Sequence, residues 1–118
     1  MFKAVALVHP TNLSPGDGEL FNVPVALIPS GGEDPKVMDS IWETLQKKEF
    51  AGKCVRKDFV SRLLMLTFAE VEIPCTDLLQ LDCHHGFASA RSDYSDPRLA
   101  GRVREAYEVL AKFFEETL

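Results

Sequence analysis

The sequence opens with two nearly continuous apolar runs that are separated by a short polar loop. Residues 2–8 read FKAVALV, and residues 23–28 read VPVALI. A strand with one solvated side alternates apolar and polar residues, whereas a run that is apolar throughout indicates a strand buried on both faces. Strands of this kind are typical of parallel sheets. The two runs therefore predict the beginning of a parallel sheet, joined by a loop over residues 11–22.

Helical periodicity follows these runs at residues 34–47 and again at residues 97–116. Asp34 is placed to cap the first helix and Pro35 to occupy its first position. The apolar positions expected on the buried face of the second helix are Leu99, Val103, Ala106, Tyr107, Leu110, Phe113 and Phe114. A weaker third strand is predicted at residues 54–60, where charged residues interrupt the apolar pattern. Strands that alternate with helices predict an α/β fold with about three parallel strands and two main helices.

Bulk composition limits the class of protein. A chain of 118 residues, 46% of them hydrophobic, is long enough for one domain with a core. The net charge of −5 argues against a nucleic-acid partner, which usually requires a basic surface. We expect no membrane partner, because the apolar runs are far shorter than about 18 residues. Three cysteines at irregular spacing give no disulfide framework, so we expect a reducing, cytoplasmic location.

A strand buried on both faces that begins at residue 2 is unusual, because no earlier residue supplies a neighbouring strand or a covering helix. A three-stranded parallel sheet on its own is expected to have open edges and uncovered faces. One interpretation is that residues 1–118 are part of a larger domain. The alternative is that a dimer or the late strands cover the sheet, which makes a homo-oligomer through the open sheet edge one expectation.

The first group with chemical potential is Gly31-Gly32-Glu33-Asp34. It follows the second predicted strand, and ligands of open α/β sheets bind at the carboxyl ends of the strands. A carboxylate on a glycine-shaped turn is well placed there to orient a histidine. The alternative is that Asp34 only caps the following helix.

The second group is Cys83-His84-His85-Gly86-Phe87, in a loop before the last predicted helix. Histidine is the usual general base near neutral pH, which makes His85 a candidate catalyst. The alternative is a pair of surface histidines without a function. Three adjacent residues do not easily converge on one tetrahedral ion, so we predict no metal site.

Taken together, the two groups resemble part of a known family. Residues 23–37, VPVALIPSGGEDPKV, and residues 84–91, HHGFASAR, are similar to the acid loop and the histidine loop of the dienelactone hydrolase family. The closing helix with Lys112-Phe113-Phe114 and the first run ending in His9-Pro10 add to the likeness, the latter to fungal members. Acid followed by histidine and a last helix is also the chain order of α/β-hydrolases. The resemblance covers residues 2–60 and 84–118 and implies the C-terminal part of an α/β-hydrolase fold.

By this resemblance Asp34 is the acid and His85 the histidine of a catalytic triad that hydrolyses small esters or lactones without a cofactor. The family nucleophile is a cysteine or serine within Gly-x-Cys/Ser-x-Gly, and no such motif occurs in this sequence. Arg91 is a weaker candidate, for binding a substrate carboxylate. We therefore expect little activity from this chain alone. The rival interpretations are an inactive truncated product and a module that pairs its open strand with another chain.

Residues 61–83 do not fit the family pattern. In the family the third strand leads almost directly to the histidine loop, and here a stretch with poor periodicity intervenes. We interpret it as an atypical insertion, either a retained intron or gene-model error over about residues 61–80 or a true lid-like segment.

Overall fold

The computed structural model describes residues 1–31, 33–59, 95 and 97–118. Three strands, β1 (Val5–Val8), β2 (Val25–Ile28) and β3 (Val55–Arg56), form a parallel sheet in the order β1-β2-β3. Val5 lies beside Val25, and Ala26 lies beside Val55. A further parallel bridge between Ser30 and Phe59 continues the pairing past the end of β2. The predicted parallel α/β sheet is confirmed.

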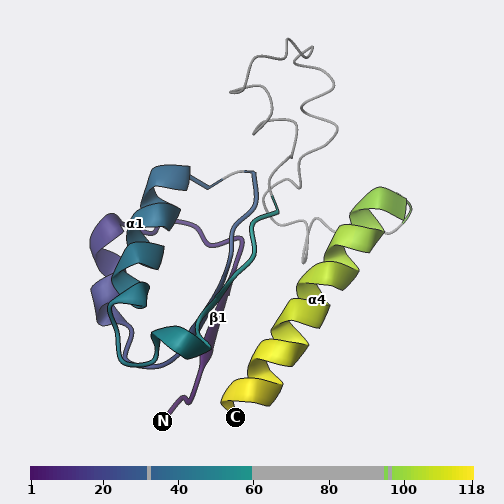
Figure 1. Ribbon diagram of the computed structural model, residues 1–118. Helices are drawn as coiled ribbons and strands as arrows, with labels where there is room; N and C mark the ends of the chain where they lie inside the picture. The colour runs from purple at the N-terminus through teal and green to yellow at the C-terminus, as the bar shows by residue number, and fades with distance from the viewer. Residues whose placement is uncertain (32, 60–94, 96) are drawn as a thin grey trace.

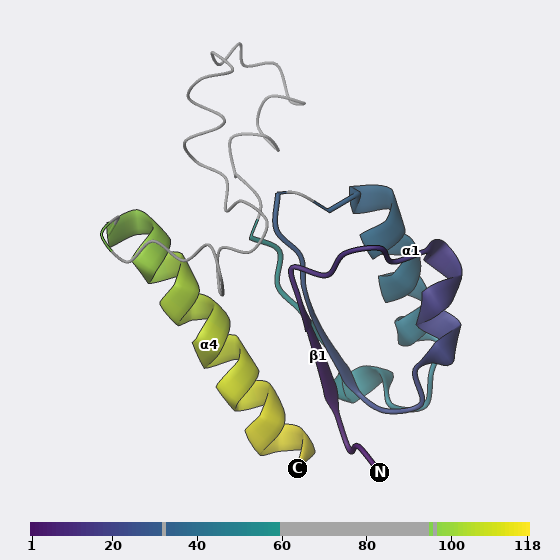
Figure 2. The ribbon, with the colours of Figure 1, turned by 180° about the vertical axis from the view of Figure 1, so that it is seen from behind.

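Helices cover both faces of this sheet (Figures 1 and 2). Helix α1 (Pro35–Gln46) and the short 3-10 helices η1 (Pro15–Leu20) and η2 (Ala51–Lys53) lie on one side, and α4 (Pro97–Thr117) lies on the other. All four residues of β2 are fully buried as a result. The expectation of uncovered faces was therefore wrong for the central strand. The reason is that the last helix returns across the sheet from far along the chain.

Two apolar clusters divide the residues of β2 between the two faces, because successive side chains of a strand point to opposite sides. Val25 and Leu27 pack toward α1, in a cluster that also contains Met38, Ile41 and Leu45. Ile28 packs toward α4, in a cluster that also contains Phe59, Val103 and Ala106.

The loop predicted at residues 11–22 contains a helical turn that the sequence analysis did not predict. The backbone N–H of Ser14 donates to Oδ2 of Asp17 at 2.7 Å, which closes the first turn of η1. Gly18 is buried, and a Cβ atom built on it would lie 3.0 Å from Cβ of Thr44 and 3.3 Å from Cα of Ile41. The absence of a side chain at Gly18 thus allows η1 to lie directly on α1.

Tyr107 was expected on the buried face of α4, and this expectation was wrong. The residues of α4 that pack in the cluster with Ile28 are Leu99, Val103, Ala106, Val109 and Leu110, and Phe113 is also buried. Tyr107 lies about 100° around the helix from Ala106 and about 40° beyond Val103, at the margin of the apolar stripe that these residues form. It retains 51% of its exposed surface, so one aromatic side chain of α4 has no place in the core of the described residues.

Candidate functional site

The carboxyl ends of the three parallel strands meet at one edge of the sheet. His9 follows β1, Ser30 follows β2 and Phe59 follows β3. Helix α1 begins at this edge, directly after Asp34. Open α/β sheets bind ligands at this edge, so any site of the predicted kind lies here.

Asp34 is the N-cap residue of α1. Its Oδ1 accepts a hydrogen bond from the backbone N–H of Lys36 at 2.9 Å, and its backbone is extended, with φ −68° and ψ 116°. Pro35 occupies the first helical position, as predicted. The residue is exposed, and Oδ2 accepts no hydrogen bond from the part of the chain that the structure describes. The carboxylate is thus oriented through one oxygen and leaves the other toward solvent, which suits both a helix cap and an acceptor for a histidine N–H.

The side chain of Glu33, the neighbouring acid, points toward Ser30. Its carboxylate accepts from the hydroxyl of Ser30, with Oε2 at 2.9 Å and Oε1 at 3.2 Å, and also from the backbone N–H of Ser30. Ser30 is only 1% exposed, so these bonds satisfy a buried hydroxyl. Glu33 therefore closes the turn between β2 and α1 that presents Asp34. The sequence carries a signal for this role, because Ser30 and Glu33 have the S-x-x-E spacing of reciprocal capping.

Arg56 connects β3 to the helix that Asp34 caps. Its Nε and Nη2 atoms donate to the two carboxylate oxygens of Asp58 at 2.7 and 2.8 Å, and its Nη1 lies 2.8 Å from Oδ1 of Asp39 on α1. The hydrogen bond to Asp58, together with that to Asp39, raises the pKa of Arg56 above its usual value. A planar guanidinium suits this two-sided arrangement, which lysine would not reproduce. The charged residues that weakened the prediction of β3 thus attach it to α1.

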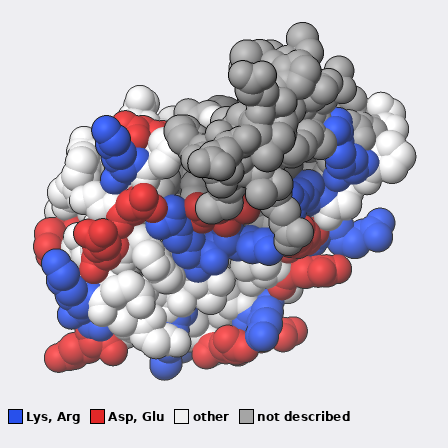
Figure 3. All heavy atoms as spheres, turned by 45° about the horizontal axis from the view of Figure 1, so that its top comes forward, with Lys and Arg blue, Asp and Glu red and all other residues white. Residues whose placement is uncertain are grey.

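On the opposite face Lys57 connects β3 to α4. Its Nζ lies 2.8 Å from Oε1 of Glu105, and Arg102 donates to Oε2 of the same carboxylate at 3.1 Å. The guanidinium of Arg102 also lies 5.6 Å from the ring centroid of Phe59. On the face seen in Figure 3, Lys and Arg are interspersed with Asp and Glu. The charged residues around β3 therefore mainly connect this strand to helices α1 and α4.

His9 lies at the same edge, with a positive φ of 40° that is uncommon for a residue with a side chain. Its backbone N–H donates to the carbonyl of Ile28 at 2.8 Å, which continues the β1–β2 pairing by one residue. His9 therefore belongs to the strand end, as its sequence position indicated.

The other predicted site residues, His85 and Arg91, lie outside the described residues, as does the segment 61–83. The structure therefore gives the position of Asp34, and the contact between Asp34 and His85 stays a prediction.

Cys54 is half-buried, and its Sγ accepts from the backbone N–H of Val25 at 3.5 Å. Burial raises the pKa of the Cys54 thiol, which opposes thiolate formation and agrees with its lack of a nucleophile motif.

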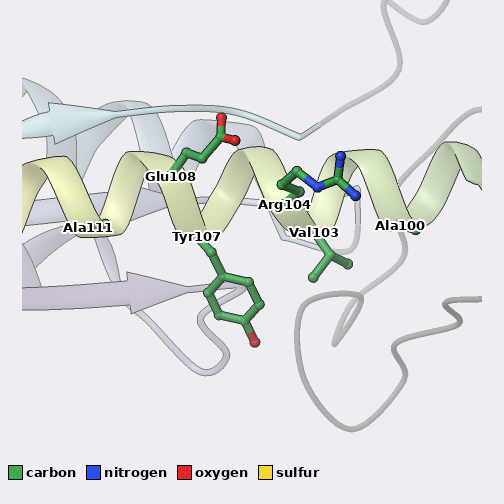
Figure 4. A pocket seen from close by; sticks show the side chains of 6 residues that line it. All are labelled: Ala100, Val103, Arg104, Tyr107, Glu108 and Ala111. Atoms are coloured by element: carbon green, nitrogen blue, oxygen red, sulfur yellow. The ribbon is translucent and has the colours of Figure 1, made fainter.

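Two surface hollows lined by described residues lie away from the carboxyl ends of the strands. One, of about 490 Å³, follows α4 beside Tyr107 (Figure 4). The other, of about 550 Å³, includes Lys3, Pro24 and Lys53, at the amino ends of the strands.

Within the described ranges no group of three His, Cys, Asp or Glu residues is arranged to hold a metal ion. None of the described helices is both long and apolar enough to cross a membrane.

Comparison with known proteins gives one distant likeness. The chain is 29% identical over 115 residues to an uncharacterized AIM2 family protein of Schizosaccharomyces pombe. The alignment covers 98% of this chain and 38% of that relative. No protein-family model and no solved structure matches the chain. The chain thus spans little more than a third of the length of that relative.

Proposed function

We propose that this chain supplies the acid and the histidine of a nucleophile–acid–histidine triad that hydrolyses ester or lactone bonds. Asp34 is the acid and His85 the general base. The observation that carries the proposal is the Asp34 carboxylate at the carboxyl end of β2, with one oxygen fixed by the N–H of Lys36 and the other directed to solvent. The order Asp34, His85, last helix adds sequence support.

The chemistry follows from these roles. His85 takes the proton of a nucleophilic cysteine or serine, which attacks the substrate carbonyl, and then gives that proton to the leaving oxygen. Asp34 accepts from Nδ1–H of the imidazole, which leaves Nε2 free to act as the base and stabilises the imidazolium that forms. Water, activated in the same way, then releases the acid product. Arg91 holds a carboxylate on the substrate through paired hydrogen bonds.

The nucleophile belongs to polypeptide outside these 118 residues, because the chain has no Gly-x-Cys/Ser-x-Gly motif. The greater length of the S. pombe relative, of which this chain covers 38%, is compatible with that arrangement. Measured alone with a p-nitrophenyl ester, the chain is expected to turn over no faster than background. Turnover that His85→Ala abolishes would show that the chain carries a nucleophile of its own and that this part of the proposal is wrong.

The pairing of Asp34 with His85 is testable without catalysis, because the sequence contains only three histidines. Nitrogen NMR, with resonances assigned through His→Gln variants, reports which ring nitrogen of each histidine carries the proton. We expect His85 to be held in the Nδ1–H form. Asp34→Asn keeps a good N-cap residue but removes the charged acceptor, so the Nε2–H form of His85 should gain population.

Asp39→Asn is the matched control, since it makes the same chemical change on α1, at a carboxylate engaged by Arg56. It should leave the tautomer of His85 unchanged. The proposal is wrong if Asp34→Asn and Asp39→Asn give the same His85 spectrum as the unmodified chain.

A second candidate function is a non-catalytic module that binds through its open strand. The observation that favours it is that β1 has a single neighbour in the described sheet.

A further inference from the structure

The turn between β2 and α1 has little shape of its own. Residues 30–35 read SGGEDP, with two adjacent glycines before Glu33. Glycine permits a wide range of backbone angles, so ordering such a segment costs more conformational entropy than ordering other residues. Contacts made by side chains must therefore hold the turn. Asp34 lies at its end, so these contacts also decide where the Asp34 carboxylate lies.

One side of the turn is anchored in the sheet through Ser30. Ser30 is 1% exposed and forms the parallel bridge with Phe59, and the backbone N–H of Phe59 donates to the carbonyl of Pro29 at 2.8 Å. Ser30 donates to Glu33 through its hydroxyl, with Oε2 at 2.9 Å and Oε1 at 3.2 Å, and through its backbone N–H. Because Ser30 is fixed to the sheet, the Glu33 carboxylate is bound to a fixed point.

The other side of the turn is anchored in α1. Three apolar side chains of this helix are buried against the sheet: Met38, Ile41 and Leu45. Pro35 restricts the residue before it to extended backbone, and Asp34 has φ −68° and ψ 116°. The N–H of Lys36 then donates to Oδ1 of Asp34 at 2.9 Å. Asp34 thus lies between two fixed parts of the fold, and Glu33 is the residue that joins it to the first.

We propose that Glu33 is a positioning residue for Asp34: by binding Ser30 it closes the turn and fixes the direction in which the Asp34 carboxylate faces. The inference rests on the proposed function, in which Asp34 is the acid of the triad. Glu33 acts through the backbone, since its carboxylate binds Ser30 and the adjoining peptide group joins it to Asp34. The two neighbouring acids therefore have separate tasks, one inside the turn and one at the edge of the sheet.

A glutamate suits this task better than related side chains do. Both of its carboxylate oxygens are acceptors, and both polar groups of Ser30 act as donors. Glutamine has the same length but only one acceptor oxygen, so it keeps part of the contact. Alanine removes the contact and takes this acceptor from the buried Ser30 hydroxyl. The freedom of the Asp34 side chain should therefore rise in the order glutamate, glutamine, alanine at position 33.

Solution NMR of the isotopically labelled 118-residue chain tests the positioning directly. Three-bond couplings of Asp34 report the rotamers about its Cα–Cβ bond, and the hydrogen bond from Lys36 predicts one dominant rotamer. In Glu33→Ala the couplings should shift toward the average of the staggered rotamers. Glu33→Gln should shift them less, and it remains informative if Glu33→Ala does not fold. Couplings that keep their original values in every Glu33 variant that folds overturn the proposal.

Two controls separate positioning from a general loss of stability. Glu43→Ala makes the same chemical change at an exposed position on α1. Phe113→Leu removes part of a buried side chain near the end of α4 and should lower stability without altering the turn. Both controls should leave the Asp34 couplings at their original values. If Phe113→Leu shifts them as far as Glu33→Ala does, the shift reflects lost stability and Glu33 is not a positioning residue.

The tautomer of His85 distinguishes failure of this proposal from failure of the proposed function. If both hold, Glu33→Ala should raise the Nε2–H fraction of His85 about twofold or more, in the same direction as Asp34→Asn. If Asp34→Asn leaves His85 unchanged while Glu33→Ala still shifts the Asp34 couplings, the proposed function is wrong and the positioning of Asp34 stands. If Asp34→Asn changes His85 and Glu33→Ala does not, the Asp34 direction set by Glu33 has no bearing on the histidine, and the proposal is overturned.

Discussion

Replacing Asp34 separates its structural role from its proposed chemical one. The side chain makes one hydrogen bond to the first turn of α1, from the N–H of Lys36 at 2.9 Å. Asp34→Ala removes this bond, and loss of an N-cap costs about 0.5–2 kcal/mol of folding free energy. The residue is exposed, so water replaces part of the lost bond, and Pro35 has no N–H that needs a partner. We therefore expect a loss of about 1 kcal/mol.

Urea unfolding followed by circular dichroism measures this loss, and a thermal scan should show a midpoint lower by about 4 °C. Asp34→Asn and Asp34→Ser keep a capping oxygen and should lie within about 0.5 kcal/mol of the original chain. An Asp34→Asn protein as unstable as Asp34→Ala would refute the capping argument, since the charge and not the hydrogen bond would then be what stabilises α1. An Asp34→Ala protein of unchanged stability would refute it as well.

Three further predictions concern the frame around the site. Gly18→Ala should destabilise the chain by about 1–3 kcal/mol in urea unfolding, because its Cβ would meet Thr44 at 3.0 Å, whereas Gly16→Ala, with no atom within 4 Å, should be nearly neutral. Gly101→Ala inside α4 also meets no atom within 4 Å and should raise stability by about 0.5–1 kcal/mol, which a lowered thermal midpoint would contradict. The hydrogen bond from Lys57, and then that from Arg102, lowers the pKa of Glu105. Because the pKa is lowered on folding, the ionised carboxylate stabilises the fold at pH values above the usual glutamate pKa, and this stability is lost as the pH falls through the lowered pKa. Glu105→Gln should therefore reduce the loss of stability in acid, by well under about 1 kcal/mol because the carboxylate is partly solvated. If the pH dependence of stability is unchanged in this variant, the ion pairs of Glu105 contribute nothing to stability.

The elements with a strong apolar pattern could be predicted from the sequence, but their ends depend on neighbours. The second run is apolar from residue 23, yet β2 begins at Val25, and the first run begins at residue 2, yet β1 begins at Val5. Each strand extends only as far as it has the other strand beside it. Phe2, which belongs to the first apolar run but precedes β1, remains 82% exposed. Pairing partners lie far away in the sequence, so local periodicity cannot locate these boundaries.

The candidate site likewise contains residues that the sequence predicted and residues that it did not. Asp34 as a helix cap followed from a short local pattern, and the structure confirms it. The inward turn of Glu33 was missed, although its spacing from Ser30 carried a signal, because a buried hydroxyl that needs a partner is visible only once the chain is folded. Tyr107 was misassigned because helical periodicity gives the width of an apolar stripe poorly, and only the sheet shows which side α4 turns toward it.

The two core clusters of the sheet also have a consequence for the order of folding. The cluster on the α1 face draws only on residues from Leu7 to Cys54, whereas the cluster on the other face needs α4, which begins at Pro97. Contacts between residues close in sequence form sooner, because they close shorter loops. During synthesis, the first half of the chain should therefore acquire α1 and the sheet while Ile28 and Phe59 still face solvent. Until α4 is made, this exposed apolar face leaves the nascent chain prone to aggregation.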